Sequence, residues 1–566
     1  MPTAMFGAEC EYAVSGINRK GAMRREDLVN RLVLAARRGL VHLQDSSSSC
    51  GMFLENGARF YIDCGLHPEM ATPECATPWE LARYIKAGDR ILEALTREVQ
   101  AEYGDAAEIM CFRCNVDYSG SGSTWGCHES YLHRAHPTSL PEQLIPHLVT
   151  RVVYTGAGGF NPLVSGPEFC VAPRLMHIAQ VISGDSTSNR GIFHTKNESL
   201  SSNGYNRLHI LCGESLCSET AIVLKIGATA LVVAMAEAGL KPAADMRFAS
   251  PIEALHTVST DITCKQALRL ADGGQVTAVE IQRRLLGKAQ DHLAKLPPWA
   301  GEVCGLWRRT LGRLDDAPES AATVLDWAIK HRLLGDRAAR RGVPFERFPF
   351  FNSLVRRLNA ALDGSLAVGR DVRLGLLAGP DSPMPEVAAE VGAALAARGL
   401  AWDDLERFLK LRDELCQIDT RFGQIGPRGI FSELCRRGVL DGGVSGIDGI
   451  EAAMSSPPAA GRARIRGETI RRLSGQIGAC CGWQGVFSGD GSSLDLSDPF
   501  AATEIWTAPH APPEPRGEPL PDVPMDEPLG IDAGRLQQLF GAMRRRYGRS
   551  RTGAQGSPET TEGPPG

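Results

Sequence analysis

The sequence lacks a hydrophobic run that would cross a bilayer. Its most apolar stretch, residues 222–235, is interrupted by Lys225 and falls short of the roughly 20 residues that a membrane-spanning helix needs. The first residues, MPTAMFGAECEYAV, have neither the basic start nor the long apolar core of a signal peptide. The formal net charge of -5 gives no general attraction to nucleic acid. These absences predict a cytoplasmic protein that binds neither membranes nor nucleic acid, with residues 222–235 forming a buried helix.

The sequence patterns of a cysteine zinc site and of the common nucleotide-binding loops are also absent. The 16 cysteines are scattered through the 566 residues, and Cys111 and Cys114 form a CxxC without a second pair at the spacing of a zinc site. Neither a Walker A loop nor a GxGxxG fingerprint occurs, so a nucleotide would have to be held in another way. We therefore expect reduced cysteines and no P-loop or dinucleotide fold.

The composition changes along the chain and predicts three regions. Residues 1–420 form the main domain, with an Ala-, Gly- and Leu-rich helical insertion around 360–410. Residues 421–506 form a small mixed module. Residues 507–566 are a Pro-rich tail, in which 507–528 cannot bury enough apolar surface to fold and 536–546 form a short basic helix.

Two glutamates share one face of a predicted strand at residues 5–14. Side chains of a strand alternate between its faces, so Phe6 and its even-numbered neighbours point into a core while Glu9 and Glu11 point the other way. Adjacent carboxylates repel, and a cation such as Mg²⁺, which prefers oxygen ligands, relieves that repulsion. The alternative is an edge strand with a solvated acidic face.

A second strand is predicted at residues 58–63, with Tyr61 and Asp63 on one face. Asp63 ends this strand, and Glu69 follows in what we expect to be a loop. A strand end holds a carboxylate rigidly, so Asp63 could serve as a general base and Glu69 as a metal ligand. Ordinary solvent-facing acids are the alternative.

Histidine and arginine occur on two further polar faces. His128 follows a glycine-rich loop, and Arg207 shares a strand face with His209 in residues 205–212. An arginine on such a face can clamp phosphate oxygens, and Arg190 and Lys196 add positive charge nearby. A structural histidine and an ion-paired surface arginine are the alternatives. Together, the four segments have the composition of a magnesium–nucleotide site.

Four blocks of the sequence resemble one known family, the Pup ligase (PafA) and Pup deamidase/depupylase (Dop) family. They are GAECEY at 7–12, FLENGARFYID with HPEMATPEC at 53–75, NVDYSGSGSTWGCHESYL at 115–132, and RARIRGE at 462–468 followed by Trp483 and DPF at 498–500. The resemblance covers roughly residues 4–505. It implies an α+β, glutamine-synthetase-like domain at 1–420, with a curved, mainly antiparallel sheet flanked by helices, and a smaller C-terminal module that contacts nucleotide.

The resemblance also implies roles for individual residues. It makes Asp63 the catalytic aspartate. The implied metal ligands are Glu9, Glu11, Glu69 and His128, with Tyr61 beside them. The implied nucleotide contacts are Arg207, Arg464 and Trp483, to which Arg190 and His209 are added as candidates. Within the segment 195–200, Lys196 and Asn197 depart from the family pattern, which puts phosphate binding there in doubt because lysine does not replace a bidentate arginine.

The implied activity depends on ATP and Mg²⁺. ATP phosphorylates the side-chain carboxylate of the C-terminal glutamate of a Pup-like modifier, and a lysine of a target protein then attacks the acyl phosphate. A functional link to a proteasome follows from the same resemblance. Only residues 14–52 separate the first predicted strand from the NGAR block, and this short separation favours the ligase branch of the family. Alternatives are a deamidase/depupylase, a ligase for a small molecule or peptide, and an inactive binding relative.

Overall fold

A computed structural model of the 566-residue chain describes residues 4–509, except for 64, 105–106, 119–121, 137, 165–166, 185–188, 195–199, 201–203, 362–381 and 442. Residues from Met1 to Pro509 belong to one compact unit. The predictions for the tail beyond residue 509, and for Lys196 and Asn197, lie outside the described residues.

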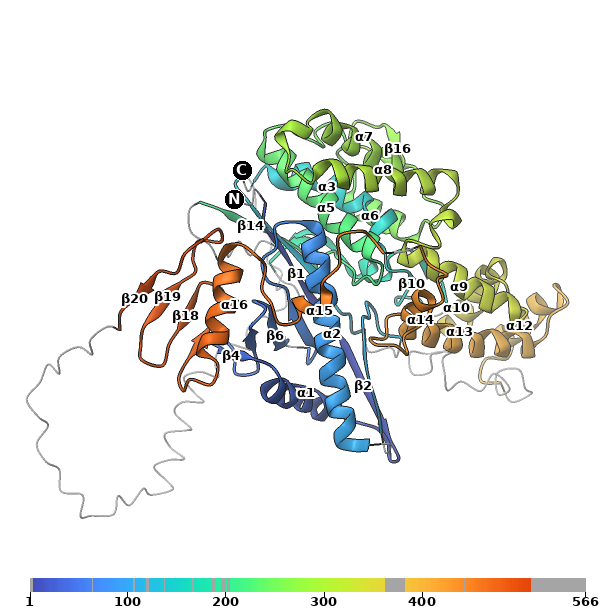
Figure 1. Cartoon of the computed structure of the whole chain (residues 1–566). Coiled ribbons are helices and arrows are strands. Elements are labelled where there is room, and N and C mark those ends of the chain that lie inside the picture. The colour runs from blue at the N-terminus through green and yellow to red at the C-terminus, as the bar shows by residue number, and fades with distance from the viewer. Residues whose placement is uncertain are drawn as a thin grey trace, which may run out of the picture. The chain divides into compact units, whose positions relative to one another are not determined.

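A 13-stranded sheet organises the unit (Figure 1). Across the sheet the order is β12 (Gln180–Ser183), β13 (Gly191–His194), β14 (Asn206–Ile210), β9 (Cys127–His133), β1 (Phe6–Glu11), β7 (Pro68–Ala71), β6 (Arg59–Ile62), β5 (Met52–Leu54), β4 (His42–Asp45), β17 (Cys480–Cys481), β18 (Gly485–Phe487), β19 (Ser493–Asp495) and β20 (Trp506–Thr507). Only the β12–β13 and β4–β17 pairs are parallel among these strands. The predicted mainly antiparallel sheet is therefore confirmed.

Smaller sheets border the large one. After Tyr12 the chain continues from β1 into β2 (Ala13–Asn18), which pairs with β3 (Gly21–Ala22) and β8 (Ala107–Phe112). Two further sheets are the pairs β10 (Gly159–Phe160) with β11 (Phe169–Cys170) and β15 (Leu268–Arg269) with β16 (Gln275–Val276).

Strand β1 shows the alternation that its sequence predicts. Phe6, Ala8 and Cys10 are buried in the core, whereas Glu9 and Glu11 are only half-buried on the opposite face. Because β1 is central, its partners on both sides continue that polar face.

Helices pack against the apolar face. The sheet shares its main core with α1 (Arg25–Gly39), α2 (Pro78–Tyr103) and α5 (Glu219–Glu237). Helix α5 is long and apolar enough to cross a membrane by composition alone, but 78% of its most apolar window is buried inside the structure. It is a core helix, as predicted for residues 222–235.

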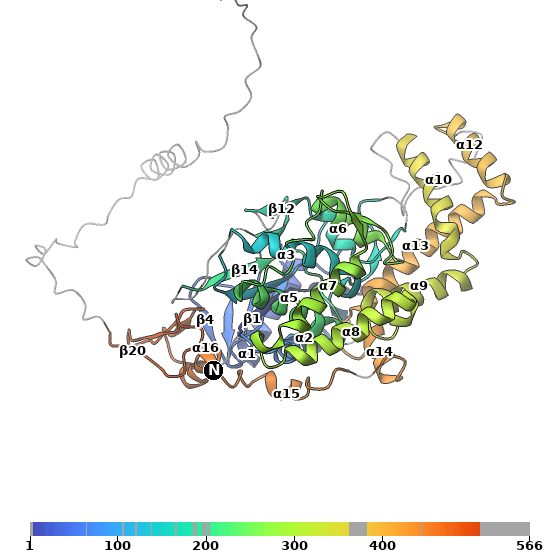
Figure 2. The same ribbon diagram turned by 90° about the horizontal axis from the view of Figure 1, so that it is seen from above.

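Figures 1 and 2 show the remaining helices toward the end of the sheet away from β18–β20, except for α15 and α16. They are α3 (Leu140–Thr150), α4 (Val152–Thr155), α6 (Pro251–Thr260), α7 (Ala278–Asp291), α8 (Ala300–Asp316), α9 (Asp326–Arg340), α10 (Phe348–Ala361), α12 (Pro385–Ala396), α13 (Trp402–Phe422), α14 (Ile430–Arg436), α15 (Ile450–Ala453) and α16 (Gly461–Leu473).

Helices α10, α12 and α13 form a core of their own, in which Phe351, Val391 and Phe408 are buried. They flank and overlap the predicted insertion at 360–410. Helix α13 continues past residue 420, so the expected domain boundary falls inside a helix.

The C-terminal module is built onto the large sheet. Strand β17 pairs in parallel with β4, and β18 to β20 continue the sheet from there. Helix α16 covers this end, where Ile465 and Val486 share a small core with Leu43 and Phe53. The module therefore shares both hydrogen bonds and core residues with the N-terminal strands, which fixes its side chains relative to those of β1 and β6.

Candidate active site

The polar face of the sheet opens into a cavity of about 720 Å³. It is lined by nine of the eleven predicted site residues: Glu9, Glu11, Tyr61, Asp63, Glu69, His128, Arg207, His209 and Trp483. Register explains the convergence, because Glu11 and Tyr61 both pair with Glu69, and Glu9 pairs with His128. Glu69 lies on β7 and not in the expected loop, because the chain reverses tightly between Asp63 and His67, with Leu66 at a φ of 59°.

Five carboxylates line this cavity: Asp45 is ion-paired with Arg59, and the other four are Glu9, Glu11, Asp63 and Glu69. Burial and the negative charges of Glu9 and Glu11 raise the pKa of Glu69 well above its ordinary value. For Glu9, burial would raise the pKa, but the hydrogen bond from His128 and the positive charges nearby outweigh it and lower the pKa. Burial also raises the pKa of Asp63. The cavity thus concentrates negative charge that a bound cation would neutralise.

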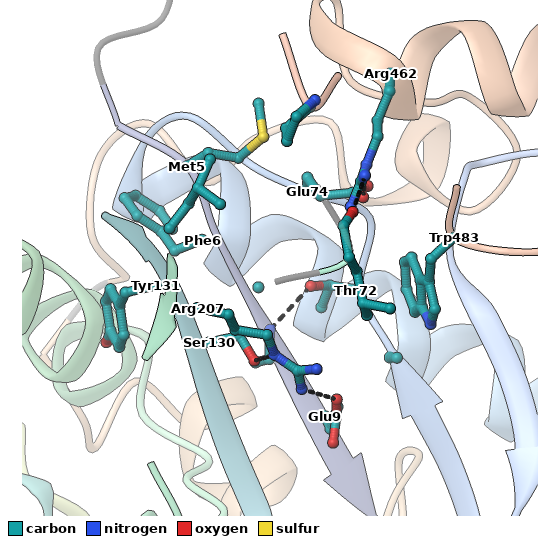
Figure 3. A pocket seen from close by; sticks show the side chains of 16 residues that line it. Met5, Phe6, Glu9, Thr72, Glu74, Ser130, Tyr131, Arg207, Arg462 and Trp483 are labelled. Atoms are coloured by element: carbon teal, nitrogen blue, oxygen red, sulfur yellow. Dashed lines mark hydrogen bonds and ion pairs between the residues drawn. The ribbon is translucent and has the colours of Figure 1, made fainter. Parts of the chain in front are cut away.

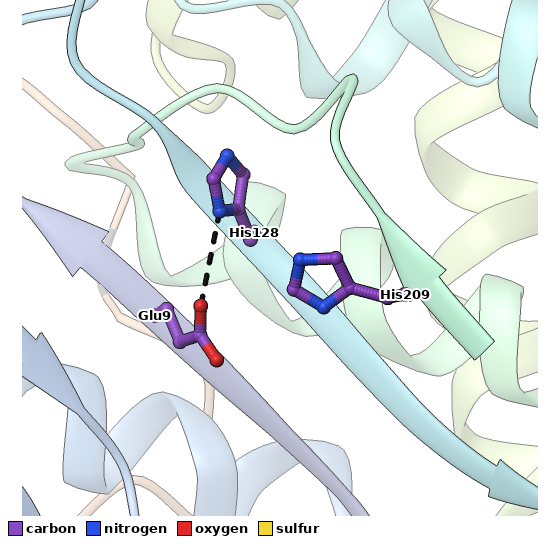
Figure 4. Close-up of side chains that lie close together, drawn as sticks. All are labelled: Glu9, His128 and His209. Carbon is purple, nitrogen blue, oxygen red and sulfur yellow. Dashed lines mark ion pairs between the residues drawn. The ribbon is translucent and has the colours of Figure 1, made fainter. Parts of the chain in front are cut away.

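One metal-ligand group joins three adjacent strands (Figure 4). Glu9 on β1, His128 on β9 and His209 on β14 each offer a ligand atom within 4.8 Å of the others. His128 Nδ1 is 3.8 Å from a Glu9 carboxylate oxygen, and its Nε2 is buried without a hydrogen-bond partner among the described residues. Burial lowers the pKa of His209 to about 3, so its imidazole is neutral and able to bind a metal. His209, predicted as a nucleotide contact, therefore also belongs to a metal-ligand group.

A second metal-ligand group consists of Glu11, Asp63 and His67. His67 Nδ1 is 2.9 Å from a Glu11 oxygen, and the backbone N–H groups of Gly65 and His67 donate to Asp63 Oδ1 at 2.9 and 2.8 Å. Sequence reasoning missed His67, although it lies in the same HPE segment as Glu69. The missing information was the reversal after Asp63, which returns His67 to the polar face.

Arg207 provides positive charge at the edge of the acidic cluster (Figure 3). Its Nε donates to Ser130 Oγ at 3.0 Å, and one terminal nitrogen donates to a Glu9 oxygen at 3.3 Å and lies 2.9 Å from His209 Nδ1. These contacts hold the guanidinium at the cavity wall, where it can meet a phosphate.

A smaller, largely apolar pocket of about 110 Å³ adjoins the cavity and shares Glu9, Leu200, Arg207 and Trp483 with it. Trp483 lies in the turn between β17 and β18. Figure 3 shows Trp483 opposite Arg207, with the pocket between them. The pocket is otherwise lined by residues of β1, β9 and the segments beside them: Met5, Phe6, Gly7, Ala8, Ala71, Thr72, Glu74, Ser130, Tyr131, Leu132, Arg462 and Pro499.

Two predicted residues do not reach either cavity. Arg464 on α16 pairs with Glu468 at 2.7 Å and donates to the Ala502 carbonyl at 2.8 Å. Helical periodicity explains the difference, because Arg462 is rotated by about 200° from Arg464 and lines the apolar pocket in its place. Arg190 precedes β13 and is absent from the described lining residues of both cavities.

The model of the family described as Pup-ligase protein matches residues 4–349 and 393–487. The chain belongs to the Pup-ligase family. The match leaves residues 350–392 of this family member uncovered, a segment that overlaps the predicted insertion.

Relatives of the Pup-ligase family agree with this assignment. The chain is 32% identical over 479 residues to the Pup–protein ligase of Sanguibacter keddieii, covering 83% of this chain and 89% of that protein. Its fold matches PafA in complex with Pup, with a TM-score of 0.67, 27% identity and coverage of 88% and 90%. It also matches PafA in complex with ADP, with a TM-score of 0.62, 28% identity and coverage of 85% and 92%. The resemblance found in the sequence and the α+β fold are therefore confirmed.

Proposed function

We propose that the chain is an ATP-dependent ligase that joins the side-chain carboxylate of the C-terminal glutamate of a Pup-like modifier to a lysine of a target protein. The observation that carries this proposal is the convergence of Glu9, Glu11, Asp63, Glu69, His128, His209 and Arg207 on one cavity of a Pup-ligase family member. The similar PafA structures contain Pup or ADP, which agrees with a modifier and a nucleotide as ligands.

The residues present fit Mg²⁺. Its preferred oxygen ligands are available on Glu9, Glu11 and Glu69, and the unpaired, buried Nε2 of His128 lies beside them. When bound, Mg²⁺ neutralises phosphate oxygens and so favours transfer of a phosphoryl group. Glu9, Glu11, Glu69 and His128 are the residues that would hold the ion.

The nucleotide would span both cavities. Arg207 is placed to contact phosphate oxygens at the boundary of the acidic cluster. The apolar pocket beyond it, closed by Trp483, provides a flat apolar surface for the base. In this arrangement the terminal phosphate would lie in the larger cavity, which Asp63 lines.

Asp63 would act in the second half of the reaction. The side-chain carboxylate of the modifier's glutamate first takes the terminal phosphoryl group of ATP, which gives an acyl phosphate and ADP. A target lysine then attacks the acyl carbon and phosphate leaves, while Asp63 accepts a proton from the ammonium group. Two backbone bonds occupy Asp63 Oδ1, so Oδ2 is the oxygen that takes this proton. Its raised pKa makes it a stronger base than an ordinary aspartate.

The test mixes the protein with Mg-ATP, a Pup-like modifier that ends in glutamate and a lysine-bearing acceptor. We expect a mass gain on the acceptor together with ADP, and a loss of roughly 10²- to 10⁴-fold in the rate for Asp63→Asn. Asp448→Asn, whose side chain is 91% exposed, is the matched control and should keep the wild-type rate.

Release of ammonia from a glutamine-terminated modifier, without conjugation, would assign the chain to deamidase chemistry. An unchanged conjugation rate in Asp63→Asn would remove Asp63 from the mechanism. The predicted cytoplasmic location and proteasome link stay predictions from the family resemblance.

A further inference from the structure

A single carboxylate joins the C-terminal module to the catalytic sheet. Glu74, in the segment that follows β7, accepts a hydrogen bond from Arg462 Nε at 2.6 Å and is also ion-paired with Arg466. Both arginines come from α16, four residues apart and therefore on one helix face. Figure 3 shows Arg462 reaching down from that helix to Glu74 at the rim of the apolar pocket.

This cluster is buried, unlike most ion pairs of the module. The Arg466 side chain is fully buried and also donates to the Gly57 carbonyl at 3.0 Å. Gly57 itself lies close to α16, because a Cβ built on it would meet the Ala463 carbonyl oxygen at 3.0 Å. Arg462 donates to the Leu496 carbonyl at 3.0 Å and to that of Leu200. The contacts fix both guanidinium groups in single positions.

The guanidinium of Arg466 also packs against Trp483. Its Cζ lies 4.9 Å from the centroid of the Trp483 ring, on which Phe53 packs edge-on with centroids 5.1 Å apart. A guanidinium over an indole face is attracted by the ring's quadrupole. Arg466 thereby connects the ion pair with Glu74 to the ring that separates the two cavities.

We infer that Glu74 and Arg466 are positioning residues that orient Trp483 for nucleotide binding. The inference rests on the proposed function, because it takes the nucleotide base as the ligand of the apolar pocket. Neither residue needs to touch a phosphate in this arrangement. The ion pair with Glu74 fixes the position of the Arg466 guanidinium. The guanidinium fixes the orientation of the Trp483 indole, and the indole forms a wall of the apolar pocket.

The arrangement predicts that nucleotide affinity depends on the shape of residue 466 as well as on its charge. Lysine can keep the ion pair with Glu74, but it has no flat guanidinium to lie against the indole. Arg466→Lys should therefore weaken binding of Mg-ADP and raise the KM for ATP by about threefold to tenfold. The kcat at saturating ATP should stay within about twofold of wild type, because the phosphoryl-transfer groups are untouched.

Arg471→Lys is the matched control. Arg471 lies on the same helix and also pairs with the N-terminal region, through Glu55 at 2.8 Å. It is half exposed, and the guanidinium that lies over the Trp483 ring is that of Arg466. Its Mg-ADP affinity should equal that of the wild type. The double variant Glu74→Gln/Arg466→Gln keeps the net charge of the cluster, but it leaves Arg462 buried without its counter-ion, so it should lose at least as much Mg-ADP affinity as Arg466→Lys.

Isothermal titration of Mg-ADP into the full chain decides the inference, with steady-state kinetics as the second readout. In a Trp483→Leu background, Arg466→Lys should have no further effect on Mg-ADP affinity. Wild-type affinity in Arg466→Lys, an equal loss in Arg471→Lys, or a full additional loss in the Trp483→Leu background would each overturn it. A wild-type chain that binds no nucleotide would overturn the proposed function as well, so the two failures can be told apart.

Discussion

Both faces of the sheet at β9, β1 and β7 bury acidic side chains, but the surroundings of these acids differ in charge. On the core face, Glu129 is fully buried and bonded to Arg151 at 2.6 and 2.8 Å, with Lys225 at 3.7 Å. On the cavity face, Glu69 is almost as buried, yet its close neighbours include Glu9 and Glu11. Glu129 thus has cationic neighbours, whereas Glu69 has acidic ones.

The pKa values express this contrast. Burial alone would raise the pKa of Glu129, but Arg151 and Lys225 outweigh burial and lower it. Burial raises the pKa of Glu69, and the neighbouring carboxylates raise it further. Removing one partner of a buried ion pair is strongly destabilising, whereas unpaired charge of one sign leaves a site that a ligand can complete. The comparison identifies the cavity face as the functional one without reference to any relative.

Removing the paired acid should have the largest effect on stability. Glu129→Gln leaves Arg151 and Lys225 buried without a counter-ion, so the free energy of unfolding should fall by about 3–5 kcal/mol. Because the folded pKa of Glu129 is lowered, its contribution is present above the unfolded value of about 4.3 and is lost as the pH falls through the folded pKa. The difference in the free energy of unfolding between the wild type and Glu129→Gln should therefore be largest near neutral pH. Urea titration at several pH values measures it.

Glu98→Gln is the matched control for this change, because Glu98 pairs with Arg38 at 2.8 Å but both side chains are exposed. Its cost should stay below about 1 kcal/mol. Equal losses of unfolding free energy in the two variants would mean that burial of the Glu129–Arg151 pair does not increase the cost of removing its acid.

Local sequence patterns were sufficient to predict several residues of the cavity. Alternation on β1 and β6 was sufficient to put Glu9, Glu11 and Tyr61 on one face, because a strand periodicity needs no knowledge of the partner strands. The pairing of those strands depends on the tight reversal after Asp63, and this tertiary detail placed Glu69 on β7 and brought His67 to Glu11. Such details cannot be obtained from periodicity.

The module shows the opposite limit. A motif match assigned residues 462–468 to the module, but it did not show which arginine faces the pocket, because that depends on how α16 is rotated about its axis. Burial of Arg462 and Arg466 around Glu74 sets the rotation. The ion pair joins residues almost 400 positions apart, beyond the reach of a local pattern.

Removing the unpaired acid should change stability in the opposite direction. In the absence of divalent cations, Glu69→Gln should raise the free energy of unfolding at pH 7 by about 0.5–2 kcal/mol, while conjugation activity falls. The folded pKa of Glu69 is raised, so its stabilising contribution is full below the unfolded value of about 4.3 and is lost as the pH rises through the folded pKa. The advantage of the variant should therefore grow with pH. Urea titration in EDTA, repeated with Mg²⁺, measures both effects.

With Mg²⁺ present, the wild type should have the larger free energy of unfolding. A cation that binds the folded wild type adds stability that the Glu69→Gln variant largely lacks. A variant that is less stable than the wild type in EDTA at every pH would show that Glu69 is paired in the folded protein. It would also break the contrast with Glu129.

The smallest effect is expected at Arg464, whose side chain contacts Glu468 and a carbonyl at the surface of the module. An i,i+4 pair on an exposed helix contributes about 0.3–0.5 kcal/mol, so Arg464→Met should change stability by no more than this. Its Mg-ADP affinity should match the wild type, whereas Arg462→Met should weaken binding because Arg462 lines the base pocket and holds Glu74. Calorimetric titration of the two variants side by side measures the difference. A loss of affinity confined to Arg464→Met would mean that α16 turns its other face to the nucleotide, and that the charge pairing around Glu74 does not set its orientation in the working enzyme.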